Sequence, residues 1–225
     1  MKRLKILSGL NKLISLSVLL TLFLFSCNNG STPASEEIKD TGKIANKDSG
    51  KHTGKDSIPL STLSPSLQIQ MKPYNNAKEG FAMDYPATWF LDDTSRPHSI
   101  TFISPLENEE DKFNEAISVI VTRLSGPITL DRFVNNSLEH LKKSRKDTLT
   151  IKRKEDVKIG RLPAKRIEYS MKFAPSEKSP APLNTRFLVY VIFKNKTAYT
   201  ITAVAQFDTY DHYLPIFQQT VESFR

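Results

Sequence analysis

The stretch Phe187-Leu188-Val189-Tyr190-Val191-Ile192-Phe193 is followed by Lys194-Asn195-Lys196 and then by a second strand-like run over residues 197–206. Successive side chains of a strand point to opposite faces of a sheet, so the first run is apolar on both faces. A short apolar run bounded by turn residues is typical of a buried strand. We therefore predict that the two runs form a tight hairpin at the centre of a sheet.

Other segments show the same pattern of short alternating runs separated by turn residues. Strands are predicted over residues 80–85, 99–104, 116–124, 149–159 and 164–173, and Pro86 and Pro105 end the first two. A helix should follow Thr129, its expected cap. A second helix should close the chain, with Pro215 in its first turn, where a missing N–H is tolerated. Successive strands with one internal and one terminal helix predict an α+β domain, a mostly antiparallel sheet covered by helices.

The amino terminus has the features of a secretory signal. Four basic residues precede a short apolar run, which ends in Leu24-Phe25-Ser26-Cys27. This ending resembles a bacterial lipobox, in which Cys27 is lipidated and becomes the first mature residue. We therefore predict a lipoprotein signal peptide over residues 1–27. The alternatives are an uncleaved anchor and an ordinary signal followed by an incidental thiol.

Residues 28–66 are predicted to be a disordered polar tether. They are rich in Ser, Thr, Gly, Asn and Lys and contain almost no large apolar residues, so they cannot bury enough surface to offset the entropy of ordering. The functional interpretation is a flexible spacer between membrane and domain, and the alternative is a neutral leftover sequence. The remaining residues, 67–225, have the length of one domain.

The order of several motifs resembles the PsbP-like family. The motifs are Gly80-Phe81-Ala82-Met83-Asp84-Tyr85-Pro86-Ala87-Thr88-Trp89, Ile128-Thr129-Leu130, Ile159-Gly160 with Pro163-Ala164, Tyr199-Thr200-Ile201-Thr202-Ala203, and Ser223-Phe224. The resemblance covers residues 67–225. It implies an α/β/α sandwich with six or seven mostly antiparallel strands, and a binding or assembly module rather than an enzyme. The lipobox and the tether favour the bacterial envelope lipoproteins of this family.

The composition argues against several classes of site. Removal of the leader, which has four basic and no acidic residues, lowers the formal charge from +8 to +4, and this is too small for a nucleic-acid-binding footprint. Cys27 is the only cysteine, so no Cys-ligated zinc or thiol nucleophile is expected in the domain. No glycine-rich phosphate loop is present. We expect no cofactor, with Ca²⁺ as the one alternative.

Two charged clusters are candidate sites. The acidic residues Glu107, Glu109, Glu110 and Asp111 follow the strand at 99–104, and their carboxylates could hold Ca²⁺, although a solvated loop is the favoured explanation. The second cluster could contact anionic headgroups, or could mark a charged helix end and an edge strand that discourages strand addition. It consists of Lys142, Lys143, Arg145, Lys146, Lys152, Arg153 and Lys154.

The leading functional hypothesis is a non-catalytic binding or assembly module, lipid-anchored in a bacterial envelope at the periplasmic face or the cell surface. Its expected partners are the membrane, through the anchor, and an envelope protein, but no nucleic acid. The first alternative is an envelope enzyme that uses His212 with Asp208 or Asp211 as acid and base. Aspartates at that position also favour helix capping. The second alternative is a calcium-binding module that uses the loop at 107–111.

Overall fold

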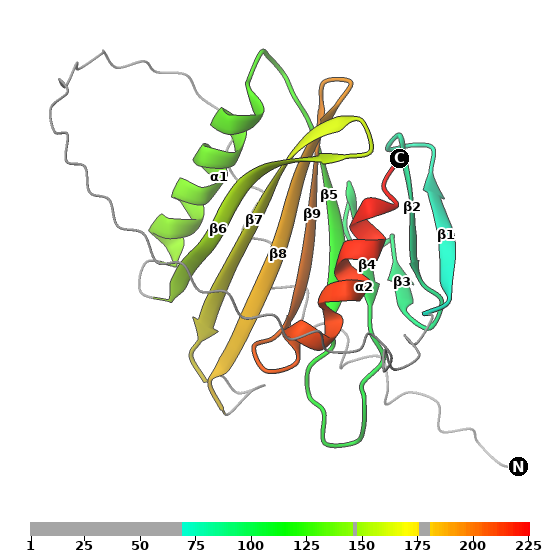
Figure 1. The fold of residues 1–225 in the computed structure, drawn as a ribbon, viewed down its shortest axis with the longest axis vertical. Coiled ribbons are helices and arrows are strands. Elements are labelled where there is room, and N and C mark those ends of the chain that lie inside the picture. The colour runs from blue at the N-terminus through cyan, green and yellow to red at the C-terminus, as the bar shows by residue number, and fades with distance from the viewer. Residues whose placement is uncertain (1–68, 146–147, 176–180) are drawn as a thin grey trace, which may run out of the picture. The chain divides into compact units, whose positions relative to one another are not determined.

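The computed structural model describes residues 69–145, 148–175 and 181–225. The predicted leader with Cys27, the tether at 28–66 and Lys146 lie outside these residues. The described chain forms the helices and strands labelled in Figure 1. Among them, no helix is both long and apolar enough to cross a membrane.

A seven-stranded sheet forms the centre of the described domain, in the order β3-β4-β5-β9-β8-β7-β6 with every neighbouring pair antiparallel. The predicted hairpin, now β8 and β9, lies in the middle of this order. The α+β prediction is therefore confirmed. The strands are β3 (Phe90–Asp92), β4 (Ser99–Ile103), β5 (Ala116–Arg123), β6 (Leu149–Ile159), β7 (Leu162–Phe173), β8 (Leu183–Lys194) and β9 (Thr197–Gln206).

The central hairpin turns through two residues, because Lys194 pairs directly with Thr197. Asn195 and Lys196 have φ angles of 50° and 58°. Positive φ at both central residues is the requirement of a type I′ turn, whose twist matches that of the flanking strands. The turn therefore sets the register that places each apolar side chain of β8 on its face.

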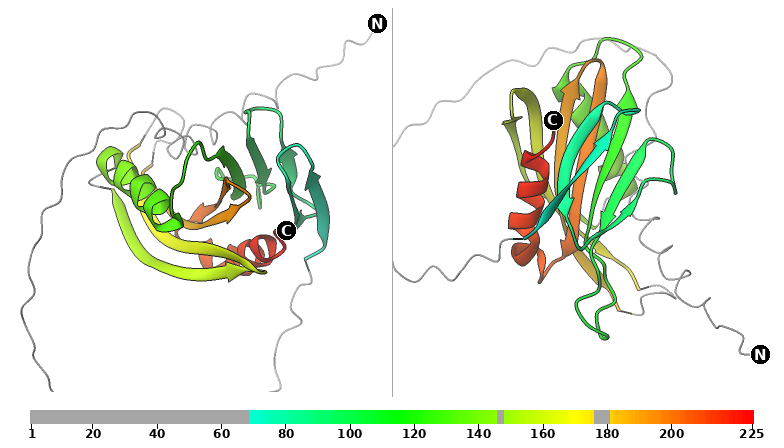
Figure 2. Two further views of the ribbon diagram at one scale, coloured as in Figure 1. Left: turned by 90° about the horizontal axis from the view of Figure 1, so that it is seen from above. Right: turned by 90° about the vertical axis from the view of Figure 1, so that its right-hand side faces the viewer.

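The two faces of β8 pack against different helices. Leu188, Tyr190 and Ile192 belong to the core that includes α2 (Tyr210–Glu222), whereas the alternate residues Phe187 and Val189 belong to the core that includes α1 (Leu130–Ser144). The helices accordingly lie on opposite faces of the sheet (Figure 2). α1 packs over β7 and β8, and α2 packs over β8, β9 and β2. Each helix thus covers only part of its face.

A separate antiparallel hairpin, β1 (Met71–Asn76) and β2 (Phe81–Pro86), lies beside α2 (Figure 1). The carboxyl end of the chain joins it, since the backbone N–H and C=O of Ala82 and Arg225 form two hydrogen bonds of 2.9 Å. Trp89 follows this hairpin, is buried, and lies near the rings of Tyr213 and Phe217. The α2 side of the sheet is therefore closed by a helix and a hairpin together.

Three details differ from the sequence predictions. β1 and β3 were not predicted, because β1 is polar and β3 has only three residues. Pro215 is the sixth residue of α2 rather than part of its first turn, since the helix begins at Tyr210. The N-cap of α2 is Thr209, without a side-chain capping bond, so neither neighbouring aspartate caps it. By contrast, Thr129 caps α1 as predicted, accepting a hydrogen bond from the N–H of Arg132.

Candidate functional site

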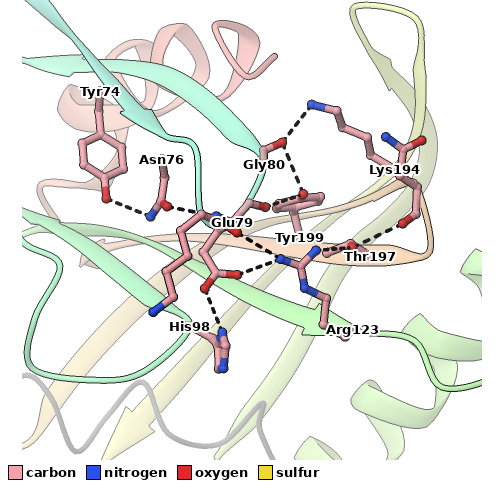
Figure 3. Close-up of polar contacts among 11 residues, drawn as sticks. Tyr74, Asn76, Glu79, Gly80, His98, Arg123, Lys194, Thr197 and Tyr199 are labelled. Carbon is pink, nitrogen blue, oxygen red and sulfur yellow. Dashed lines mark hydrogen bonds and ion pairs between the residues drawn. The ribbon is translucent and has the colours of Figure 1, made fainter.

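Glu79, in the turn between β1 and β2, is the centre of the most developed polar cluster of the described domain. Its residue is only 3% exposed. The carboxylate points toward His98 and Arg123 (Figure 3). Its Oε1 lies 2.8 Å from Nδ1 of His98, and its Oε2 accepts a hydrogen bond of 3.2 Å from Nη2 of Arg123. Both oxygens of a buried carboxylate are thus paired, which buried charges require.

The backbone around Glu79 is also fixed by hydrogen bonds. Its N–H donates to Oδ1 of Asn76 at 3.0 Å, and its C=O accepts from the hydroxyl of Tyr199 at 2.8 Å. The next carbonyl, that of Gly80, accepts from Nζ of Lys194 at 3.0 Å. Gly80 has a φ of +77°, and a Cβ there would lie 3.4 Å from the Tyr199 hydroxyl. The turn therefore needs glycine for its left-handed conformation.

The partners of Glu79 come from three strands of the large sheet. Arg123 ends β5 and also donates to the hydroxyl of Thr197 at the start of β9, at 3.0 Å. His98 lies immediately before β4 with a φ of 57°, and its C=O accepts from the N–H of Val121 in β5. The Glu79 carboxylate thus links the small hairpin to β5 and to the residue before β4, and Arg123 and the backbone C=O of Glu79 extend the link to β9.

An imidazole oriented by a carboxylate is a common acid–base arrangement, and the side chain of His98 is 57% exposed. In the described residues, however, no hydroxyl, amide or second imidazole is hydrogen-bonded to the His98 ring, and the other carboxylate oxygen is taken by Arg123. The geometry is that of an electrostatic clamp between the hairpin and the sheet.

A second buried carboxylate, that of Glu115, directly precedes β5 and lies close to Thr209, the N-cap of α2. It accepts hydrogen bonds from the hydroxyls of Ser104, at 3.1 Å, and Thr209, at 3.2 Å. Burial disfavours its charged form and raises the pKa of this carboxyl above its ordinary value of 4.5. Nearby, burial and a hydrogen bond to Glu107 raise the pKa of Tyr213.

The predicted acidic residues lie on an exposed loop whose conformation is fixed by hydrogen bonds to its own side chains. Asp111 accepts hydrogen bonds from the backbone N–H groups of Glu107 and Phe113, and Asn108 accepts from those of Glu110 and Asp111. Glu107 accepts from the hydroxyl of Tyr213 at 2.7 Å. Within this loop, only Glu109 and Glu110 have carboxylates without a partner in the described chain. Across residues 69–145, 148–175 and 181–225, no His, Cys, Asp or Glu group is placed to hold a metal, and calcium binding stays a prediction.

The predicted basic residues are divided between the two faces of the sheet. Lys142 and Lys143 are exposed at the end of α1, and Arg145 caps that helix. Lys154 donates to Asn135 of α1, whereas Lys152 lies over the ring of Phe207 and Arg153 approaches Glu168. β6, which carries the last three, is an edge strand. The placement fits a charged helix end and a protected edge strand.

His212, Asp208 and Asp211 are exposed at the start of α2. Asp211 accepts a hydrogen bond of 2.8 Å from Arg186, and His212 is bonded to neither aspartate in the described chain. The ring of His212 lies edge-on to that of Tyr213. No acid–base pair is therefore assembled among these three residues.

Three of the four large apolar side chains that are exposed in the described residues lie on β3 or shortly after β4, a feature the sequence pattern did not indicate. Phe90 and Leu91 of β3 are 61% and 38% exposed, and Leu106, shortly after β4, is 45% exposed. Phe90 pairs with Ile103, so Leu106 follows closely on its partner strand. We call Phe90, Leu91 and Leu106 the apolar corner. The acidic loop at 107–111 begins directly after it.

Replacing Glu79 with Gln should lower the free energy of unfolding by about 2 kcal/mol, because hydrogen bonds to charged groups contribute more than neutral ones. Chemical denaturation followed by circular dichroism measures this loss. The matched control is Glu139→Gln on the exposed face of α1, where we expect almost no change. Equal effects of the two substitutions would show that the clamp does not stabilise the fold.

Glu115→Gln should become progressively more stabilising relative to wild type as the pH rises above 4.5. A carboxyl whose pKa is raised on folding binds protons more tightly in the folded state, so wild-type stability falls between the unfolded and folded pKa values. A glutamine at this position does not titrate. Unfolding measured from pH 4 to pH 7 should show the difference growing, and a constant or shrinking difference would refute the shift.

Comparison with solved structures places this architecture among known folds. The Ran-binding protein Mog1p of Saccharomyces cerevisiae matches with 13% identity and a TM-score of 0.50, over 70% of this chain and 95% of that one. PsbP of the cyanobacterium Synechocystis sp. PCC 6803 matches with 15% identity and a TM-score of 0.48, over 74% and 98% of the two chains. LpqN, involved in cell envelope biogenesis of Mycobacterium tuberculosis, matches with 16% identity and a TM-score of 0.47, over 70% and 90%. At such identity the likeness to Mog1p shows the fold alone.

No curated protein matches the chain at a significant level. The model of the PsbP family, by contrast, matches residues 69–225. This range includes both hairpins, the Glu79 clamp and both helices, and it spans more than half of the chain. The protein therefore belongs to the PsbP family.

Proposed function

We propose that this protein is a lipid-anchored, non-catalytic binding module of a bacterial cell envelope that docks a protein partner at the apolar corner. Membership of the PsbP family supports a module of this kind. The observation that carries the proposal is the exposure of Phe90 and Leu91 on the edge strand β3 and of Leu106 shortly after β4. Apolar side chains exposed along an unpaired sheet edge offer a site for an added partner strand.

The edge position favours an extended segment of the partner. No described strand pairs with the outer side of β3. Leu91 is opposite Phe102 and Phe90 is opposite Ile103, so the two exposed side chains lie on different faces of the edge. A strand added to β3 would therefore meet an apolar side chain on either face, as in strand addition to a sheet edge.

The acidic loop favours a partner that is positively charged. Glu109 and Glu110 are exposed beside the apolar corner and have no partner among the described residues. Charges at the rim of an interface steer encounter and select partners of opposite sign. The proposed partner is therefore a protein whose extended segment carries apolar side chains flanked by lysine or arginine.

The anchor rests on the amino-terminal sequence. A basic start, a short apolar run and a lipobox ending in Ser26-Cys27 are the elements of a lipoprotein signal peptide. A single acyl chain gives only marginal membrane binding, and the multiple chains of a bacterial lipoprotein give a stable anchor. Residues 28–66 would then provide the reach from membrane to partner.

The test is photocrosslinking of the full-length protein in its own membranes, with a photoreactive phenylalanine in place of Leu91. We expect one discrete protein adduct, which Glu109→Lys combined with Glu110→Lys should diminish because the charge of the rim is reversed. The matched control carries the same group at Glu139 on α1, where no adduct is expected. Cys27→Ser should move the protein to the soluble fraction.

Two results would contradict the proposal. Equal adducts from positions 91 and 139, or none from position 91, would remove the apolar corner as the docking surface. Membrane retention of the Cys27→Ser protein would remove the lipid anchor.

A further inference from the structure

A hollow of about 300 Å³ lies where β6, β7 and β8 meet the segment after β9. Its volume is at the lower end of the range for small-molecule sites. None of the residues that line it belongs to the Glu79 clamp or to the apolar corner. The lining residues are Thr148, Thr150, Ser170, Met171, Lys172, Asn184 and Phe207.

Strand register brings the polar lining together. Thr150 of β6 is directly opposite Ser170 of β7, and Lys172 of β7 is directly opposite Asn184 of β8. Ser170 and Lys172 are two residues apart, so their side chains point to the same face. Directly opposite side chains in a sheet have Cβ atoms about 5 Å apart. Two hydroxyls, one carboxamide and one ammonium group therefore form a compact array.

These four polar groups have no partners within the described chain. No hydrogen bond or ion pair engages the side chains of Thr150, Ser170 or Asn184, or the ammonium group of Lys172. Two other cations on β7 and β8 are paired: Lys165 lies 2.6 Å from Asp131, and Arg186 lies 2.8 Å from Asp211. The hydrogen-bonding capacity of the array is therefore not used by the described residues.

Phe207 forms an apolar wall beside the array, and its residue is 44% exposed. Lys152 lies 4.9 Å and Arg186 lies 5.7 Å from the centroid of its ring. Arg186 is paired with Asp211, whereas the ammonium groups of Lys152 and Lys172 are paired with no carboxylate of the described residues. The surroundings are therefore positive, and favour a ligand with negative charge.

We propose that this hollow binds an acidic sugar, a single ring that carries a carboxylate. The carboxylate pairs with the ammonium group of Lys172. The ring hydroxyls exchange hydrogen bonds with Thr150, Ser170 and Asn184, all of which both donate and accept. The apolar C–H face of the sugar lies against Phe207. This ligand class uses the charge, the hydroxyl array and the aromatic wall together.

The test is a titration of the full-length protein in detergent with glucuronate, glucose and inorganic phosphate, followed by calorimetry and by NMR. We expect glucuronate to bind at least about tenfold more tightly than glucose, because a charge-assisted hydrogen bond is stronger than a neutral one. Lys172→Met and Phe207→Ala should each weaken glucuronate binding by about tenfold or more. Both replaced side chains are exposed, so the fold should persist.

Lys158→Met is the matched control, since it removes an exposed lysine at the other end of β6 and should leave binding unchanged. Phosphate binding as tight as that of glucuronate would show a general anion site and overturn the sugar assignment. Absence of glucuronate binding, or equal loss in the Lys158→Met control, would overturn the proposal as a whole.

Discussion

The burial of β8 on both faces is the constraint on which the rest of the structure depends. Its residues from Phe187 to Ile192 are buried, and alternate ones belong to two different cores. A strand of this kind is stable only inside a sheet that is covered on both sides, because each face exposes apolar area to water otherwise. One helix on either side meets this requirement (Figure 2). The sandwich is thus the consequence of one doubly apolar strand.

The candidate sites lie where this covering ends. α2 and the β1–β2 hairpin share one face, and the Glu79 carboxylate fixes the hairpin through His98 and Arg123. On the same sheet, β3 and β6 are the edges, and neither helix reaches across both of them. The β3 edge carries the apolar corner, and the β6 side carries the polar hollow. Binding surfaces on sheet margins supported by a rigid centre are a common arrangement in small domains.

The strongest elements could be predicted from sequence because their evidence is local. The apolar run of β8, the alternation in β7 and the Thr129 cap each depend on residues within one segment. β1 and β3 have no such pattern, and Pro215 was misplaced because the start of α2 is set by packing of Tyr210 rather than by a capping side chain. Local sequence patterns predict the existence of an element better than its exact boundaries.

The candidate sites were harder to predict, since they arise from residues far apart in the chain. Glu79 looks like an ordinary surface glutamate until the fold brings His98 and Arg123 to it, from 19 and 44 residues away. Thr150, Ser170 and Asn184 become neighbours only through strand register. The charged clusters that the sequence did highlight are divided by the sheet or closed on their own backbone.

Native-state hydrogen exchange tests most directly whether the central hairpin is the stable core. Amides in the middle of β8 and β9 should exchange only through global unfolding, with an opening free energy equal to that from chemical denaturation. The amides of β1, β2 and β3 should open at lower free energy, since these strands lie at the margins. Faster exchange in β8 and β9 than in these marginal strands would contradict the account.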